Sequence, residues 1–336
     1  ELRQLTQPKH MWVLIFLLSL CYVGLIFPGC WILSKQRTLH FLVTYGTIAG
    51  LACIFSLMFL FIGRRGYGEA TSLHSVAIAR AEDDTHCSAI QMTTLFVTSG
   101  NTYSVNDKDH QTLLASGSSE ENVDARITSG NTASFVSRIP PYSSQAIRSR
   151  RRIETENWQL AVTSLSQQRD ELNSLSIAFG DKFPDAPEVK CMVIHGRNIY
   201  RTKMDSTKRL IELGGGREPL HSYCQSRTNY TMGPPLPQLA DAPDDPDADP
   251  VEMCFKKMLP DLVRRSFIDD CVQNVNKFRL PEDRIRLLVY APMLDSQHLG
   301  FSGDARRSGR VLYVRDLLLN PGSQNVDVVA PGEPPE

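Results

Sequence analysis

Two long apolar stretches constrain this chain more than any other feature of its sequence. They cover residues 11–33 and 41–62, and neither contains a charged residue. Each is longer than the roughly 20 residues that cross the hydrocarbon core of a bilayer. Only a short segment, carrying Lys35 and Arg37, separates them. The sequence therefore predicts a transmembrane helical hairpin at residues 1–66, with spans at about 11–33 and 41–62.

Small residues mark one side of the second predicted span. Gly46 and Gly50 lie four positions apart, and Cys53 follows them. Small residues at this spacing allow two helix backbones to approach closely. We expect Gly46, Gly50 and Cys53 to form a helix-packing face against the first helix of the same hairpin. The alternative is a face that joins two copies of the chain.

A series of short motifs accompanies the two stretches: Tyr22, Phe27-Pro28-Gly29, Ile32-Leu33, Gly63-Arg64-Arg65-Gly66-Tyr67-Gly68 and Leu73-His74-Ser75-Val76-Ala77-Ile78-Ala79. In these motifs the chain resembles a group of uncharacterised bacterial membrane proteins. The resemblance covers about the first third of the chain and implies a short cytoplasmic loop between the spans. It also implies a β-rich domain outside the plasma (inner) membrane. The positive charges alone favour the opposite orientation, because Arg64 and Arg65 flank the second span.

The region 67–232 is predicted to be a β-rich domain. The sequence Thr-Ser-Gly-Asn-Thr occurs at 98–102 and again at 128–132, each time between β-forming residues. Glycine and asparagine tolerate the positive φ that tight hairpin turns require. The two copies could mark a duplicated hairpin or be coincidental. A further hairpin is expected at 191–201, around Gly196.

The rest of the chain divides by composition. Residues 233–250 form a Pro- and Asp-rich linker, and 251–280 a helical insertion in which Pro260 is expected to separate two helices. Residues 281–319 add C-terminal strands, and 320–336 form a disordered tail. The predicted fold class is therefore a membrane-anchored α+β chain, in which a two-helix transmembrane hairpin precedes a mainly antiparallel β-sandwich-like domain with a helical insertion.

Two further motifs could bind phosphate, and for both we favour a structural role. The run at 148–152 contains four arginines, and it could bind anionic groups or form a solvated connection that protects a strand edge. The triplet at 214–216 consists of three glycines, but the lysine of a phosphate-binding loop is absent. We expect the triplet to form a flexible hairpin end.

The sequence does not contain a recognisable catalytic or metal-binding motif. Its eight cysteines lack the close spacing of zinc sites, and the soluble part contains an odd number of them. His221 and Cys224 could share a helix face, which is weak evidence for a reactive thiol. The prolines of the linker disrupt the geometry that a calcium loop would need. No catalytic residue, cofactor or metal is therefore predicted.

These observations predict a non-catalytic, membrane-tethered β-domain that acts as an interaction or scaffold module of the bacterial cell envelope. The expected partners are the lipid bilayer and membrane or envelope proteins. Nucleic acid is not expected, because the net charge is only −1. One alternative is a cytoplasm-facing, membrane-anchored regulator. A second is a membrane-tethered hydrolase whose residues converge only in the fold.

Overall fold

The structure is a computed structural model that describes residues 12–29, 40–67, 70–107, 112–116, 124–168, 171–225, 249–267 and 279–319. The predicted loop between the spans, the predicted tail and nearly all of the predicted linker lie outside these residues. Cys30 and Cys271 also lie outside them.

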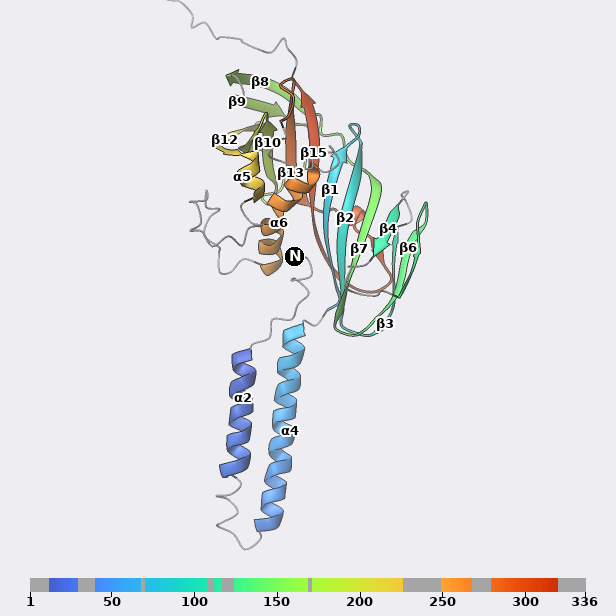
Figure 1. Cartoon of the computed structure of the whole chain (residues 1–336), viewed down its shortest axis with the longest axis vertical. Coiled ribbons are helices and arrows are strands. Elements are labelled where there is room, and N and C mark those ends of the chain that lie inside the picture. The colour runs from blue at the N-terminus through green and yellow to red at the C-terminus, as the bar shows by residue number, and fades with distance from the viewer. Residues whose placement is uncertain are drawn as a thin grey trace, which may run out of the picture.

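Two helices precede the sheets. Helix α2 spans Trp12–Gly24 and continues into a π-helical turn at Leu25–Gly29, and α4 spans His40–Tyr67. They run beside each other away from the sheets (Figure 1), and the rings of Tyr22 and Phe55 meet at 5.0 Å. Many of their apolar side chains are exposed, for example Phe16 and Leu57. The pair therefore adds little to the buried cores of the β-rich part.

The predicted fold class is wrong. No helix among the described residues has the length and apolar character needed to cross a membrane. The first predicted span shows one physical reason. Its α-helix ends at Gly24, after 13 residues, or about 20 Å of helix against a hydrocarbon core of about 30 Å. Pro28, which cannot donate a backbone hydrogen bond, lies in the π-helical turn that follows.

Strands form most of the described chain, so the predicted β-rich character is confirmed, but they do not form two comparable sheets. The long sheet contains, in spatial order, β4 (Leu113–Ser116), β7 (Ser143–Glu154), β2 (His86–Val97), β1 (Ser72–Ala81), β15 (Arg306–Leu318), β13 (Arg284–Pro292), β10 (Lys190–His195), β11 (Asn198–Asp205), β12 (Leu210–Pro219), β9 (Glu171–Ala178) and β8 (Ala161–Gln168). The short sheet contains β14 (Gly300–Phe301), β3 (Asn101–Asp107), β6 (Ala133–Ile139) and β5 (Ala125–Thr128). A 3-10 turn at Asp295–Gln297 precedes β14.

Pairing is antiparallel throughout the two sheets except between β1 and β15, which lie parallel at the centre of the long sheet. The central strand β13 is buried at seven consecutive positions. From Leu287 to Pro292 its sequence, Leu-Leu-Val-Tyr-Ala-Pro, is apolar without alternation. Such a pattern is typical of a strand that is covered on both faces.

One face of the central strands is covered by helices. Helix α6 (Pro250–Ser266) and the short α5 (Leu220–Gln225) lie against this face (Figure 1). Phe255, Leu259 and Val263 of α6 share a buried core with residues of β1, β13 and β15. Asp249 caps the helix by accepting a hydrogen bond from the Val251 N–H at 2.9 Å. We call this face of the sheet the helix face.

Pro260 does not separate two helices, contrary to the sequence prediction. It lies inside the continuous helix α6. An internal proline removes one backbone hydrogen bond. Leu259, Leu262 and Val263 are nevertheless buried around it against the sheet. Tertiary packing therefore keeps the helix continuous, and the rest of the predicted insertion, residues 268–278, lies outside the described part.

The opposite face is covered in two parts. Near the start of β1, the short sheet packs Phe135 and Val105 against Leu73 and Leu95. Further along, residues from strands near both ends of the long sheet share one core, including Ile153 of β7 with Ile177 of β9. The long sheet therefore curls, so that its β8–β9 end folds over this face.

The predicted hairpins have different outcomes. Strands β10 and β11 form the expected hairpin, with Gly196 at a φ of 57° in its turn. The turn at 128–132 joins β5 and β6, which pair with each other. The turn at 98–102 instead joins β2 to β3, which belong to different sheets. The repeated five-residue sequence is therefore not a duplicated hairpin.

Candidate functional site

The buried thiols of the described chain are poorly suited to nucleophilic catalysis. Burial raises the pKa of Cys191 to about 12 and that of Cys224 to about 12. It also raises the pKa of Cys87, which lies 3.7 Å from the Thr155 hydroxyl. A thiol with a raised pKa carries little of the thiolate form that reacts.

The suggested pair of His221 and Cys224 lies on α5. His221 is exposed, whereas Cys224 is buried in the core beneath α6. The His221 ring lies 3.3 Å from the hydroxyl of Ser222. The pair therefore does not present an activated thiol to solvent. Within the described ranges, no three His, Cys, Asp or Glu side chains come together as possible metal ligands.

The predicted helix-packing residues Gly46, Gly50 and Cys53 all lie on α4. A β-carbon built at Gly46 or Gly50 would have no neighbouring atom within 4 Å, and Cys53 is exposed. The recorded ring contact between the two helices is made by Phe55 instead. The small residues thus border open space in this structure.

The three glycines at 214–216 lie within β12, not at a hairpin end. The pairing of β12 with β11 shifts register between Tyr200 and Thr202, and Gly215 and Gly216 have φ values of 77° and 97°. These positive values allow the strand to form a bulge there. The glycines therefore shape the strand, and the sequence prediction of a flexible end is wrong.

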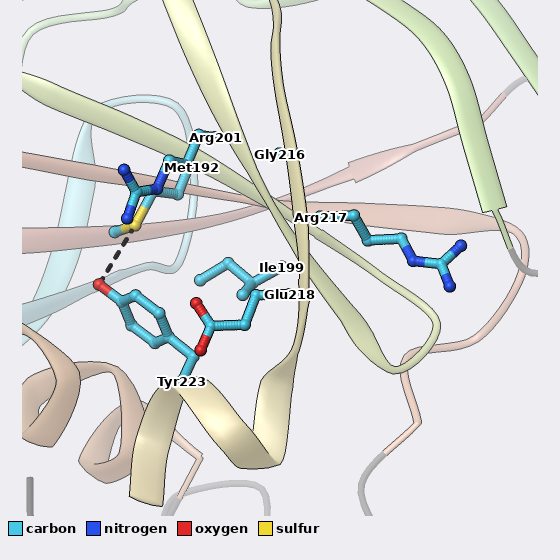
Figure 2. A pocket seen from close by; sticks show the side chains of 7 residues that line it. All are labelled: Met192, Ile199, Arg201, Gly216, Arg217, Glu218 and Tyr223. Atoms are coloured by element: carbon cyan, nitrogen blue, oxygen red, sulfur yellow. Dashed lines mark hydrogen bonds between the residues drawn. The ribbon is translucent and has the colours of Figure 1, made fainter. Parts of the chain in front are cut away.

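A small hollow lies beside this bulge (Figure 2). Tyr223 donates its hydroxyl proton toward the sulfur of Met192 at 3.5 Å, and Arg217 points away from the other lining side chains. Partial burial raises the pKa of the Glu218 carboxyl. The hollow measures only about 10 Å³, which is about the space of a single water molecule. It is too small for a substrate or a peptide side chain.

The arginine run lies in the middle of β7, not in a connection between elements. Burial alternates along this strand, so Arg148, Arg150 and Arg152 are exposed whereas Arg151 is buried. The register with β2 and β1 places the exposed arginines on the helix face. This part of the face lies beyond the cover of α6. We call these three residues the arginine row.

The arginine row is only partly neutralised. Arg152 forms ion pairs with Glu82 and Asp83 at 3.1 and 3.4 Å, and all three side chains are about half exposed. Four hydrogen bonds from Thr85 and His86 lower the pKa of Asp83, with the Thr85 backbone N–H as the largest cause. No ion pair is recorded for Arg148 or Arg150 within the described chain.

Arg151 lies on the opposite face in a buried polar network. Its Nη1 donates to Asp107 at 3.0 Å and its Nη2 donates to the side-chain oxygen of Gln91 at 2.9 Å. It also donates to the backbone carbonyl of Gln297. Asp107 accepts a second hydrogen bond from the Thr112 hydroxyl at 2.8 Å. The network fixes the position of Arg151, but its Nε has no acceptor among the described residues.

The edge of the long sheet is incomplete beside this network. Strand β4 pairs with β7 only from Ser116↔Ile147 to Leu113↔Arg150, although β7 continues to Glu154. At Thr112 the chain leaves β7 and forms an isolated bridge with Gly130, with backbone hydrogen bonds of 3.1 and 2.9 Å. Residues 151–154 therefore have β2 as their only strand partner within the described chain. We call these four residues the open edge.

A hollow of about 410 Å³ lies where β4 stops and the open edge begins. It is lined by Arg150, Arg151 and Arg152 and bounded by Leu113, Thr112 and Gly130, with Ser88 and Asn131 completing the lining. Guanidinium groups, an unpaired strand edge and a volume large enough for a side chain thus coincide at one place. This is the candidate functional site, and its chemistry suits an extended, negatively charged ligand.

Comparisons with known proteins do not assign this chain to a family. No family model matches this chain, and no curated protein matches it significantly. Among solved structures, it is similar to the Fcho1 Mu homology domain (Danio rerio) with bound Eps15 peptide. The likeness has a TM-score of 0.30 and 8% sequence identity, and it covers 74% of this chain and 96% of that chain. At this TM-score it carries no argument about this protein.

Sequence reasoning identified the arginine run but not its role in the fold. The available signal was alternation: the apolar or small residues Ile147, Ser149 and Ile153 occupy every second position with the arginines, and only Arg151 departs from this pattern. Period-two alternation predicts a strand with one solvated face. The hollow could not be found in this way, because Leu113, Gly130 and Arg151 are brought together only by the pairing of the strands.

Proposed function

We propose that this chain is a non-catalytic protein-interaction module that binds an extended acidic segment of a partner protein along the open edge of β7. The observation that carries the proposal is the early end of β4, which leaves residues 151–154 unpaired on their outer side within the described chain. Such an edge exposes backbone N–H and C=O groups that an extended peptide can pair with. Four residues correspond to about 13 Å of strand.

Charge supports an acidic partner. Side chains of an added strand alternate between the two faces, so on the helix face one residue would lie beside Arg152 and diagonal to Arg150, and the other would lie beside Glu154. Opposite charges in cross-strand pairs contribute about 0.2–1 kcal/mol each, and like charges oppose pairing. The arginine row would therefore favour glutamate or aspartate at the position beside Arg152 and disfavour lysine or arginine there.

The non-catalytic part of the proposal is supported by the protonation of the thiols. Cys191 and Cys224 both have pKa values of about 12 because they are buried. His195 is buried at 1% exposure, away from solvent. The candidate site itself presents guanidinium groups, which stay protonated at neutral pH and so cannot act as general bases. Recognition is therefore the function that its chemistry suits best.

A designed peptide tests the proposal. The probe has about eight residues that alternate glutamate and valine, with an acetylated N-terminus and an amidated C-terminus, and a lysine–valine peptide is the control. We expect the acidic peptide to bind the full chain and to slow hydrogen exchange at residues 151–154. Added salt should weaken binding, because exposed charges are screened. Exchange that slows elsewhere, or no binding at all, would contradict the proposal.

Charge-reversing variants locate the site independently. Arg150→Glu combined with Arg152→Glu should weaken binding about tenfold or more, because one directly opposed contact and one diagonal contact change from attractive to repulsive. The matched control is Arg138→Glu, an exposed arginine on β6 of the short sheet. It changes the net charge at a distant position and should leave the affinity nearly unchanged. An equal loss in the control would mean that the peptide binds through general charge and not at β7.

A further inference from the structure

We infer that the hollow at the end of β4 receives the free carboxyl terminus of the partner segment, so that the ligand is the C-terminal tail of another protein. This inference rests on the proposed addition of a strand at the open edge. It concerns which end of the segment lies in the hollow and which group the arginines contact.

The open edge is closed at one end. A strand added beside residues 151–154 would lie in line with β4, whose first residue, Leu113, already pairs with Arg150. The bridge between Thr112 and Gly130 bounds the same end, and both residues border the hollow. An added segment therefore cannot continue straight along β7 past Arg151. A segment that ends there avoids this obstacle.

Charge decides which terminus is accepted. A segment antiparallel to β7, the orientation that β4 itself has, would place its C-terminal end opposite Arg151. A parallel segment would place its N-terminal ammonium there. The hollow is lined by Arg150, Arg151 and Arg152. The exposed guanidinium groups of Arg150 and Arg152 attract a carboxylate and repel an ammonium group, whereas Arg151 is paired with Asp107 on the opposite face.

An exposed donor is available for the carboxylate. Arg150 is exposed, lines the hollow and has no ion pair within the described chain. Arg151 lies on the opposite face, where Asp107, Gln91 and Gln297 hold its guanidinium group. A terminal carboxylate with two oxygens can accept a bidentate pair of hydrogen bonds from the guanidinium group of Arg150.

The test compares two forms of the glutamate–valine peptide that differ only at the C-terminus. The form with a free carboxylate should bind the full chain about tenfold or more tightly than the amidated form, as expected for a hydrogen bond to a charged group. Extending the free-acid peptide by about four glycines should remove the advantage, because the carboxylate then lies beyond the hollow. Equal affinities of the three peptides would overturn the inference.

Two variants separate this inference from the proposal on which it rests. Arg150→Gln removes one exposed guanidinium of the hollow and should largely abolish the difference between the free acid and the amide. Arg138→Gln on β6 should preserve that difference. If the amidated peptide binds as tightly as the free-acid peptide, the proposed strand addition is supported, and the inferred recognition of the terminal carboxylate is wrong. If neither form binds, the proposed function fails as well.

Discussion

The helix face of the long sheet has two halves, which differ in the burial and ion pairing of their arginines. The covered half lies under α6 and contains Arg310, which is 3% exposed and donates to Glu188 and Glu252 at 2.6 and 2.5 Å. The open half contains Arg150, which is exposed and has no recorded ion-pair partner. A buried charge is costly unless it is paired, whereas water solvates an exposed one. The first arginine therefore serves the fold, and the second remains available for a ligand.

The strands beneath the two halves differ in the same way. Strand β13 is buried at seven consecutive positions, whereas β7 alternates between buried and exposed residues from Ile147 onward. The helix covers only the central strands, so β7 keeps one solvated face. Substitutions that remove packing should therefore be costly in the covered half and nearly neutral in the open half.

The largest effect is expected for Phe255→Ala in the covered half. Phe255 is 1% exposed between α6 and the sheet, and its backbone carbonyl accepts from the Tyr290 hydroxyl at 2.9 Å. The cavity should lower the free energy of unfolding by about 3–5 kcal/mol, measured by urea denaturation. Phe301→Ala, a half-buried position on β14 of the short sheet, should cost less. A small loss for Phe255 would show that α6 is not firmly docked.

A smaller loss is expected for Arg310→Met. The substitution removes two charge-assisted hydrogen bonds, but Glu188 and Glu252 are 59% and 36% exposed and can be solvated. We expect a loss of about 1.5–3 kcal/mol in the free energy of unfolding. Arg126→Met, at an exposed position on β5, is the matched control and should change little. Equal effects would contradict the distinction between paired and solvated arginines.

A fall in pH should lower the stability of the covered half, because His74 binds a proton less readily in the folded chain than in the unfolded chain. Burial and the positive charge of Arg306 lower the pKa of His74 in the folded chain below its ordinary value of 6.5. The unfolded chain therefore binds more protons, so stability is complete above pH 6.5 and declines as the pH falls below it. His74→Gln keeps a polar group near the Ser308 hydroxyl, which lies 2.7 Å from Nδ1. The variant should lose less stability than the wild type between about pH 7 and pH 5.

The smallest effect on stability is expected for Arg150→Ala in the open half. Its side chain is solvated, so the free energy of unfolding should change by no more than about 0.5 kcal/mol. The same variant should weaken binding of the acidic peptide. A large loss of stability would mean that the arginine row has a structural role, and the comparison between the two halves would fail.

Local patterns in the sequence predicted part of this fold correctly. Strong β-forming segments and the turn at Gly196 predicted strands and a hairpin that the structure contains. The apolar stripe around Phe255 predicted a helix packed on a sheet, and α6 is that helix. These signals are local, since each depends on side chains a few residues apart. The transmembrane spans were predicted from the same kind of signal, but no described helix has the length and apolar character needed to cross a membrane.

The sequence by itself therefore determined the β-rich character, the helix that covers the sheet, and the presence of an arginine run. Only the tertiary structure decided that Arg151 is buried while its neighbours are exposed, and that β4 ends before β7 does. The physical reason is that strand pairing joins residues far apart in the chain. Leu113, Gly130 and Arg151 form one hollow only after β4 and β7 have paired and the chain has turned away at Thr112.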